Sequence, residues 1–348
     1  MNSVLIKITC AKPKNSMLYR NFQTQAELDY QYNPSELGLD IPGYMNMYAT
    51  NSAKVREKLR CHLSVVFGST LVEHLDIFPA TQPQAPILVF IHGGYWIMSN
   101  SKDFSFVAQG LVAADVTVVV VNYALCPKVT IDEIVRQNRS AIAWIYHHAE
   151  SFGADPNRIH VAGHSAGGHL TAMLMATDWK NDYGLPDDII KGGCAISGLF
   201  DLMPFPYTWL QPKLQFTWAE VLRNSPIHHL PEKAGSLLVT YGGEETSEFQ
   251  RQSLDFLAAW KEKELPGEYL PQPNENHFTI VNGFLDTDSP LCTAILRQME
   301  KNSEGAKRPA TANRIQNGLN PSYPLTEFRS GAGEAPPPVR IAEFFFNF

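Results

Sequence analysis

The stretch that decides the fold is Gly163-His164-Ser165-Ala166-Gly167, a G-x-S-x-G pentapeptide. A largely apolar run over 158–162 precedes it, and a helix-prone run over 168–175 follows it. Small residues on both sides of a serine let the chain turn sharply from a strand into a helix, which exposes the hydroxyl at the tip of the turn. The pattern therefore predicts that Ser165 is an exposed nucleophile. The alternative is an ordinary serine N-cap, which requires neither the glycines nor a buried strand.

A second motif lies upstream and agrees with the first. The apolar run over 86–91 has the length of a strand and ends in His92-Gly93-Gly94-Tyr95-Trp96, so a buried parallel strand followed by a glycine loop is expected. Glycines leave backbone N–H groups uncovered. We therefore expect Gly93, Gly94 and Ala166 to supply N–H donors to an oxyanion hole. An ordinary strand-to-loop turn with a packed histidine is the alternative.

Length and composition bound the class of protein. With 348 residues, 44% of them hydrophobic and 18% charged, the chain is long enough to bury the core of one large α/β domain. A net charge of -7 without a basic stripe argues against nucleic acid as a partner. No apolar run approaches the roughly 20 residues of a membrane helix. We therefore expect a soluble protein that acts on a small-molecule substrate and has no membrane partner. A homodimer is also compatible with this sequence.

The cysteines indicate the redox compartment. They are odd in number, widely scattered and without C-x-x-C pairs, and they are Cys10, Cys61, Cys126, Cys194 and Cys292. Such cysteines are typical of a reducing compartment, so a cytoplasmic location is expected.

Strand-like and helix-like segments alternate along the chain. Strands are expected over 71–78, 116–121, 192–197 and 236–241, and helical segments over 104–114, 131–151 and 249–263. Such alternation builds a mostly parallel sheet with helices on both faces. The predicted fold class is α/β, specifically an α/β-hydrolase fold with a small cap insertion.

Changes in composition divide the chain into three parts. Residues 1–27 form an N-terminal extension, and 28–301 form the hydrolase domain. Within that domain, residues 200–231 are crowded with prolines and large aromatic side chains, which predicts a cap over the site. Residues 302–348 carry glycines and prolines with little apolar periodicity and are predicted to be disordered.

A nucleophilic serine needs a histidine base, which in turn needs a carboxylate. On this fold the order along the chain is serine, acid, histidine. His277 follows the short strand-like segment 268–270 and lies at the end of a polar loop, where the base is expected. His169 lies on the helix after the nucleophile, and the pair at 228–229 lies in the cap. A solvated loop histidine is the alternative for His277.

The acid is expected in the loop after the strand that ends at Tyr241. That loop contains Glu244 and Glu245 and no aspartate. Glutamate serves in place of aspartate on this fold, and Glu245 is the predicted acid. Both glutamates also fit as acids at the start of a helix, and Asp201 is an outside candidate for the acid.

Several motifs, taken in order, resemble those of a known family. They are His92-Gly93-Gly94-Tyr95-Trp96, Asn122-Tyr123-Ala124-Leu125-Cys126-Pro127, Ala162-Gly163-His164-Ser165-Ala166-Gly167-Gly168-His169-Leu170, Ser247-Glu248-Phe249 and Asn276-His277-Phe278. Over about residues 28–300 the chain resembles the kynurenine formamidases (arylformamidases), which are α/β-hydrolases related to the hormone-sensitive-lipase type of esterase. The resemblance implies the same nucleophile, base and oxyanion loop. It departs at the acid, which is usually an aspartate in a D-S-P-E-F-like segment.

The resemblance also implies a reaction. It is the hydrolysis of N-formyl-L-kynurenine to L-kynurenine and formate, a step of tryptophan degradation that needs no cofactor. Tyr95 and Trp96, with His92, are expected in the substrate pocket, where an aromatic ring would stack on the leaving group. Packing in the core is the alternative for both aromatic residues.

Two other functions compete with this one. A broad-specificity carboxylesterase for small acyl esters would use the same residues. A catalytically silent binding module is favoured only by the glutamate at the acid position, and the presence of both Ser165 and His277 argues against it. No metal site is expected, because the histidine pairs at 147–148 and 228–229 lack the spacing of metal ligands. No dinucleotide fingerprint is present either.

Overall fold

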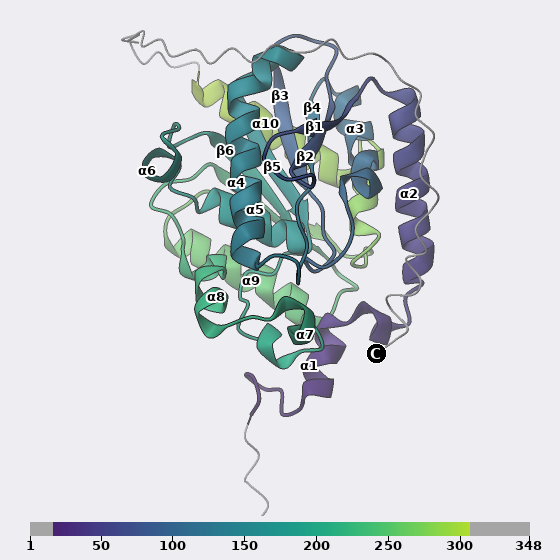
Figure 1. The fold of residues 1–348 in the computed structure, drawn as a ribbon, viewed down its shortest axis with the longest axis vertical. Coiled ribbons are helices and arrows are strands. Elements are labelled where there is room, and N and C mark those ends of the chain that lie inside the picture. Colours follow the sequence, from purple (N-terminus) through teal and green to yellow (C-terminus); the bar gives the residue numbers. More distant parts are fainter. Residues whose placement is uncertain (1–16, 307–348) are drawn as a thin grey trace, which may run out of the picture.

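A single eight-stranded sheet organises residues 17–306, the part of the chain that the computed structural model describes (Figure 1). Its strands are β1 (His62–Val66), β2 (His74–Phe78), β3 (Ala85–Ile91), β4 (Thr117–Val121), β5 (Ala154–His164), β6 (Ile190–Ile196), β7 (Ser236–Gly242) and β8 (Gly267–Gln272). The order across the sheet is β1-β2-β4-β3-β5-β6-β7-β8. Strand β2 runs antiparallel to β1 and β4, and the remaining pairs are parallel. The predicted α/β-hydrolase fold is confirmed.

Helices connect the strands. The α-helices are α1 (Gln25–Tyr32), α2 (Ile41–Lys58), α3 (Ala108–Ala113), α4 (Ile131–His148), α5 (Ala166–Met175), α6 (Trp179–Tyr183), α7 (Gln211–Leu214), α8 (Trp218–Arg223), α9 (Ser247–Glu262) and α10 (Pro290–Ala306). The 3-10 helices are η1 (Pro34–Leu37), η2 (Ser101–Val107), η3 (Ala149–Phe152), η4 (Phe205–Tyr207), η5 (Pro226–His228) and η6 (Ile280–Leu285). None of the helices within residues 17–306 is long and apolar enough to cross a membrane.

The sheet separates two hydrophobic cores. Successive side chains of a strand point to opposite faces, so Val89 of β3 packs in one core and Phe90 in the other. Helices α4, α5 and α9 close the first core, and α2, α3 and α10 close the second. Figure 1 shows α4 and α5 on one side of the sheet and α2 on the other. Because both faces are covered, the central strands read as continuous apolar runs.

Helix α2 was not expected from the apolar pattern. Its buried residues are widely spaced over 18 positions, and they are Ile41, Tyr48, Ser52 and Val55. The helix begins at an N-cap, where Asp40 Oδ1 accepts a hydrogen bond from the Gly43 N–H at 3.0 Å. An Asp cap followed by an early proline was the available sequence signal for this helix.

The boundaries also differ in detail from the predicted ones. Helix α1 begins at Gln25, before the predicted domain start, and the segment predicted over 104–114 divides into η2 and α3. The cap region consists of η4, α7, α8 and η5, and its Phe205 and Phe216 are buried in the first core. The predicted extension over 1–27 and the predicted disordered tail over 302–348 lie largely outside the described residues.

Candidate active site

Ser165 lies at a strained turn between β5 and α5. Its φ of 58° and ψ of -117° belong to a region that non-glycine residues rarely adopt. The surrounding glycines make this turn possible. A Cβ atom on Gly163 would lie 2.2 Å from the carbonyl oxygen of Gly167, and one on Gly167 would lie 1.9 Å from that of Ile91. Close backbone packing therefore holds the serine at the carboxyl edge of the sheet.

The structure brings the predicted nucleophile, base and acid together. His277 Nε2 lies 3.1 Å from Ser165 Oγ, and His277 Nδ1 lies 2.8 Å from Glu245 Oε2. The three residues follow β5, β7 and β8, which are parallel, so their loops meet at one edge of the sheet. All three are buried. The arrangement suits a serine that gives its proton to a histidine oriented by a carboxylate.

The second oxygen of Glu245 is also held. Its Oε1 accepts hydrogen bonds from Ser197 Oγ at 2.5 Å and from the Gly242 N–H at 2.7 Å. Ser197 follows β6, the strand beside β7. Both carboxylate oxygens thus have donors, which fixes the plane of the carboxylate against the imidazole. Ser197 was not predicted as a site residue, although it is the last residue of the strand predicted over 192–197.

The alternative residues lie elsewhere. Glu244 is exposed, and Asp201 accepts a hydrogen bond from the Tyr19 hydroxyl at 2.9 Å. His169 Nε2 lies 2.7 Å from the carbonyl oxygen of Asn224, in the cap region. Within residues 17–306, none of these side chains forms a hydrogen bond with His277, the predicted base.

The predicted oxyanion loop lies directly against the nucleophile. A Cβ atom on Gly93 would lie 3.1 Å from the Cβ of Ser165. Within residues 17–306, neither Gly93 nor Gly94 donates its N–H to a turn or side-chain acceptor. Ala166 begins α5, so its N–H has no acceptor within the helix. These N–H groups are therefore available to an oxygen bound beside Ser165.

Of the three residues predicted in the substrate pocket, the structure places only Tyr95 on the cavity wall. His92 stacks on Tyr123 with ring centroids 4.1 Å apart, and the Tyr123 hydroxyl donates to the His92 carbonyl oxygen at 2.8 Å. Trp96 is fully buried and meets the ring of Phe205 edge-on at 5.9 Å. His92 and Trp96 thus pack in the interior and support the loop from behind, because their rings are covered by other aromatic side chains.

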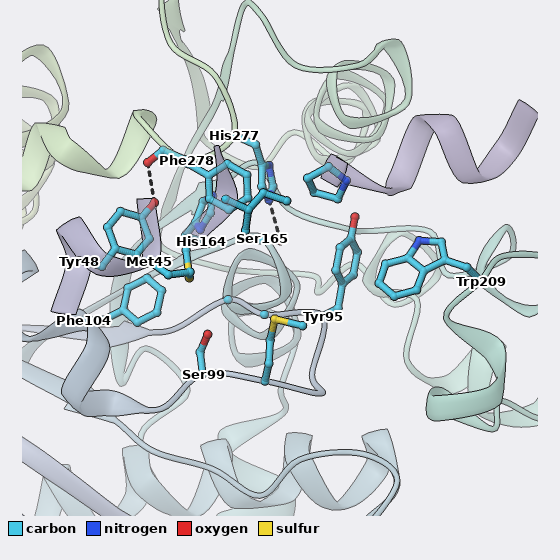
Figure 2. A pocket seen from close by; sticks show the side chains of 15 residues that line it. Met45, Tyr48, Tyr95, Ser99, Phe104, His164, Ser165, Trp209, His277 and Phe278 are labelled. Carbon is cyan, nitrogen blue, oxygen red and sulfur yellow. Dashed lines mark hydrogen bonds between the residues drawn. The ribbon is translucent and has the colours of Figure 1, made fainter. Parts of the chain in front are cut away.

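A cavity of about 50 Å³ lies beside Ser165 (Figure 2). Its lining is mostly apolar, and the lining residues contributed by η1, α2 and the cap are Pro34, Ile41, Met45, Tyr48 and Trp209. The Tyr95 ring meets the Trp209 ring edge-on at 5.9 Å, on the side of the cavity away from Tyr48. No Lys, Arg, Asp or Glu side chain of the described chain lines this cavity. The residues from α2 and the cap were not predicted, because they come together only through long-range packing.

The histidines that surround the site are held neutral. Burial lowers the pKa of His92 and of His169 to about 4. Burial also lowers the pKa of His164, next to the nucleophile, and the nearby charge of His277 lowers it further. Among residues 17–306, no group of three or more His, Cys, Asp or Glu side chains is arranged to hold a metal ion.

These buried histidines predict a loss of stability in mild acid. Below pH 6.5 the unfolded chain binds protons on His92 and His169 that the folded protein does not bind, so the free energy of unfolding falls as the pH drops towards 4. Each ring should cost about 2 kcal/mol at pH 5 relative to pH 7. Urea unfolding at pH 7 and pH 5 measures the decrease in the free energy of unfolding. In His169→Gln this decrease should be smaller by the contribution of one histidine. Equal stability of the unmodified protein at pH 7 and pH 5 would contradict this prediction.

The sheet, the serine turn and the hydrogen-bonded histidine and carboxylate behind it define a hydrolase of the α/β-hydrolase class. Two family models match the chain: BD-FAE over residues 75–193 and the prolyl oligopeptidase family over residues 136–286. Esterase B of Lactobacillus rhamnosis has the same fold, with a TM-score of 0.63 over 77% of this chain and 98% of that structure, at 15% identity.

Sequence relatives identify the family. The chain is 31% identical over 290 residues to a kynurenine formamidase of Salmo salar. This match covers 79% of this chain and 96% of that protein. It is 29% identical over 289 residues to a kynurenine formamidase of Danio rerio, with the same coverage. The chain belongs to the kynurenine formamidase family, and the resemblance carried by the sequence motifs is confirmed.

Proposed function

We propose that this protein hydrolyses N-formyl-L-kynurenine to L-kynurenine and formate. The observation that carries the proposal is the continuous hydrogen-bonded series from Glu245 through His277 to Ser165, found in a member of the kynurenine formamidase family. Fold and family alone do not establish activity, because related folds carry many functions. A complete series of nucleophile, base and acid argues against the binding-module alternative.

The first half of the reaction transfers the formyl group to the enzyme. Ser165 Oγ attacks the formyl carbon while His277 Nε2 takes the hydroxyl proton. The carbonyl oxygen becomes negatively charged and accepts hydrogen bonds from the N–H groups of the oxyanion loop and of Ala166. The carbon–nitrogen bond then breaks, and His277 gives its proton to the aromatic amine as it leaves. A formyl ester of Ser165 remains.

The second half releases formate. Water enters the position of the departed amine, His277 takes one of its protons, and the resulting hydroxide attacks the formyl ester. The ester bond to Ser165 breaks, and the proton on His277 returns to the serine oxygen. Throughout both halves, Glu245 stabilises the charged imidazolium and keeps the proton on Nδ1 of the ring.

The cavity lining fits a small neutral acyl group and an aromatic leaving group. Tyr95 and Trp209 meet at right angles and offer aromatic surface to a substrate ring. The cavity beside Ser165 is lined mostly by apolar side chains, which suits an uncharged formyl group. The free thiols at Cys61, Cys126, Cys194 and Cys292 support the further proposal of a reducing, cytoplasmic location.

Ester hydrolysis is a second candidate function. Among residues 17–306, no Lys, Arg, Asp or Glu side chain lines the cavity to distinguish an amide from an ester of the same shape. A carboxylesterase would therefore use the same serine, histidine and oxyanion loop. The two candidates differ in the acyl donor that they turn over fastest.

A comparison of substrates tests the proposal. The purified protein is expected to release formate from N-formyl-L-kynurenine with a kcat/KM at least about tenfold above that for phenyl acetate. A fluorophosphonate probe labels the active serine and shows that the sample is competent. Protein that is labelled and hydrolyses phenyl acetate but releases no formate would reject the formamidase proposal in favour of the esterase.

A further inference from the structure

The position of His277 depends on a loop that is neither helix nor strand. This loop joins β8 to η6, and the imidazole must reach Ser165 from it. Asn276 and Phe278 flank the histidine on either side. An error of about 1 Å in the placement of a catalytic group can cost a large factor in rate, so whatever holds these two neighbours influences turnover.

Helix α2 contacts both neighbours of His277, although it lies more than 220 residues earlier in the chain. The Tyr48 hydroxyl donates to the carbonyl oxygen of Phe278 at 2.5 Å (Figure 2). The Tyr44 ring stacks on the Phe278 ring, with centroids 5.0 Å apart and an interplanar angle of 6°. The Tyr44 hydroxyl also accepts a hydrogen bond from Asn276 Nδ2 at 3.0 Å. Residues four apart lie on the same face of a helix, so one face of α2 holds the loop.

The contact with Asn276 reaches the backbone around the histidine. Asn276 Oδ1 accepts hydrogen bonds from the N–H of Phe278 at 2.9 Å and from the N–H of Thr279 at 3.0 Å. Its amide nitrogen is the group bound to Tyr44. The tyrosine therefore orients the amide, and the amide fixes the backbone that follows His277.

Helix α2 is itself firmly mounted. Ser52 Oγ donates to the Asp103 carbonyl oxygen at 2.8 Å and accepts from the Phe106 N–H at 3.1 Å. The ring of Tyr48 lies against Phe104 and Phe106, with centroids 5.4 and 5.0 Å away. Burial raises the pKa of the Tyr48 hydroxyl, which keeps it protonated as a donor. A buried ring on a fixed helix makes a rigid support.

We propose that Tyr48, together with Tyr44, is a positioning residue that holds the His277 loop at the distance from Ser165 that proton transfer requires. The inference rests on the proposed role of His277 as base. Tyr48 also lines the cavity, so its ring and its hydroxyl have separate roles. The ring shapes the wall, and the hydroxyl supports the base.

The test removes the hydroxyl and keeps the ring. Tyr48→Phe is expected to lower kcat for N-formyl-L-kynurenine or phenyl acetate about tenfold, with KM within about twofold. The rate constant for labelling of Ser165 by a fluorophosphonate should fall by a similar factor, since labelling also requires His277 to take the serine proton. Ser52→Ala is the comparison variant, because it weakens the attachment of the same helix without removing a contact to the loop. Its kcat and labelling rate should fall by no more than about threefold, less than in Tyr48→Phe, because the packing of Tyr48 against Phe104 and Phe106 still holds the helix.

Each other result counts against the inference. An unchanged kcat in Tyr48→Phe, or a raised KM with normal labelling, would leave Tyr48 as a wall of the cavity only. An equal loss in Ser52→Ala would show that a loosened helix, not the loop contact, causes the effect. Unmodified protein that is labelled but releases no formate would reject the formamide substrate alone, since the labelling rates still test Tyr48. Unmodified protein that is not labelled would reject the proposed base and this inference with it.

Discussion

Ser165→Ala should reduce formate release and ester hydrolysis by at least about 10⁴-fold, because no other group in the site can form the acyl intermediate. The neighbouring hydroxyl on the cavity wall, that of Ser99, makes no hydrogen bond to His277 in the described structure. The fold should persist, since within residues 17–306 the removed oxygen has its one hydrogen bond with the imidazole, at 3.1 Å. Rates of formate release, with circular dichroism to show folding, measure the outcome.

A serine far from the site provides the control for this variant. Ser151 is exposed on η3, where its hydroxyl donates to the His148 carbonyl oxygen. Ser151→Ala should keep full activity and full labelling by a fluorophosphonate, whereas Ser165→Ala should show neither. Residual turnover clearly above about 0.01% in Ser165→Ala would mean that the reaction uses another nucleophile.

The strands and helices around the site were predictable because burial leaves a local pattern. The strand expected over 236–241 is β7 (Ser236–Gly242), and the helix expected over 249–263 is α9 (Ser247–Glu262). Strands covered on both faces are apolar at every position, and an exposed helix is apolar at every third or fourth. Each pattern depends only on neighbours along the chain.

Side-chain direction in the oxyanion loop was not predictable in the same way. Tyr95 and Trp96 are adjacent and both aromatic, yet one lines the cavity and the other is buried beneath the cap. Both have positive φ angles, 49° and 60°, and neither value can be read from the residue type. A motif of known composition therefore indicated the loop but did not assign each ring to the cavity or the core.

The partners of the predicted acid and base depend on contacts between distant segments. Ser197 reaches Glu245 because β6 and β7 are neighbours in the sheet, and Tyr48 reaches Phe278 because α2 lies beside the loop between β8 and η6. Nothing near Ser197 or Tyr48 in the sequence specifies these neighbours. The order of the strands decides them, and that order follows from the whole fold.

Glu245→Gln should lower kcat by about 10³- to 10⁴-fold while the protein stays folded. The physical reason lies in the donors around the carboxylate. The His277 ring presents an N–H to one oxygen, and the Gly242 N–H and the Ser197 hydroxyl point at the other. A glutamine has one oxygen for these two sides.

Either orientation of the glutamine amide therefore leaves a conflict. If its nitrogen faces His277, the ring must accept at Nδ1, which puts the ring proton on Nε2 and removes the base from Ser165. If its nitrogen faces Gly242, two donors meet there, and the imidazolium also lacks its counter-charge. Both outcomes impair catalysis, so the size of the loss does not depend on which orientation the amide adopts. The pH dependence of kcat/KM, measured alongside kcat, should differ from that of the unmodified protein, because the protonation of His277 is altered.

Two further variants separate charge from reach. Glu244→Gln changes the exposed neighbour and should leave kcat within about twofold, because that carboxylate does not contact His277. Glu245→Asp keeps the charge but shortens the side chain by one methylene, so it cannot bridge His277 and the Ser197–Gly242 pair at their present distances. We expect a loss of about 10- to 100-fold, smaller than for Glu245→Gln, because the charge that stabilises the imidazolium remains. Full activity in Glu245→Gln, with a loss in Glu244→Gln, would instead transfer the role of the acid to the neighbouring residue.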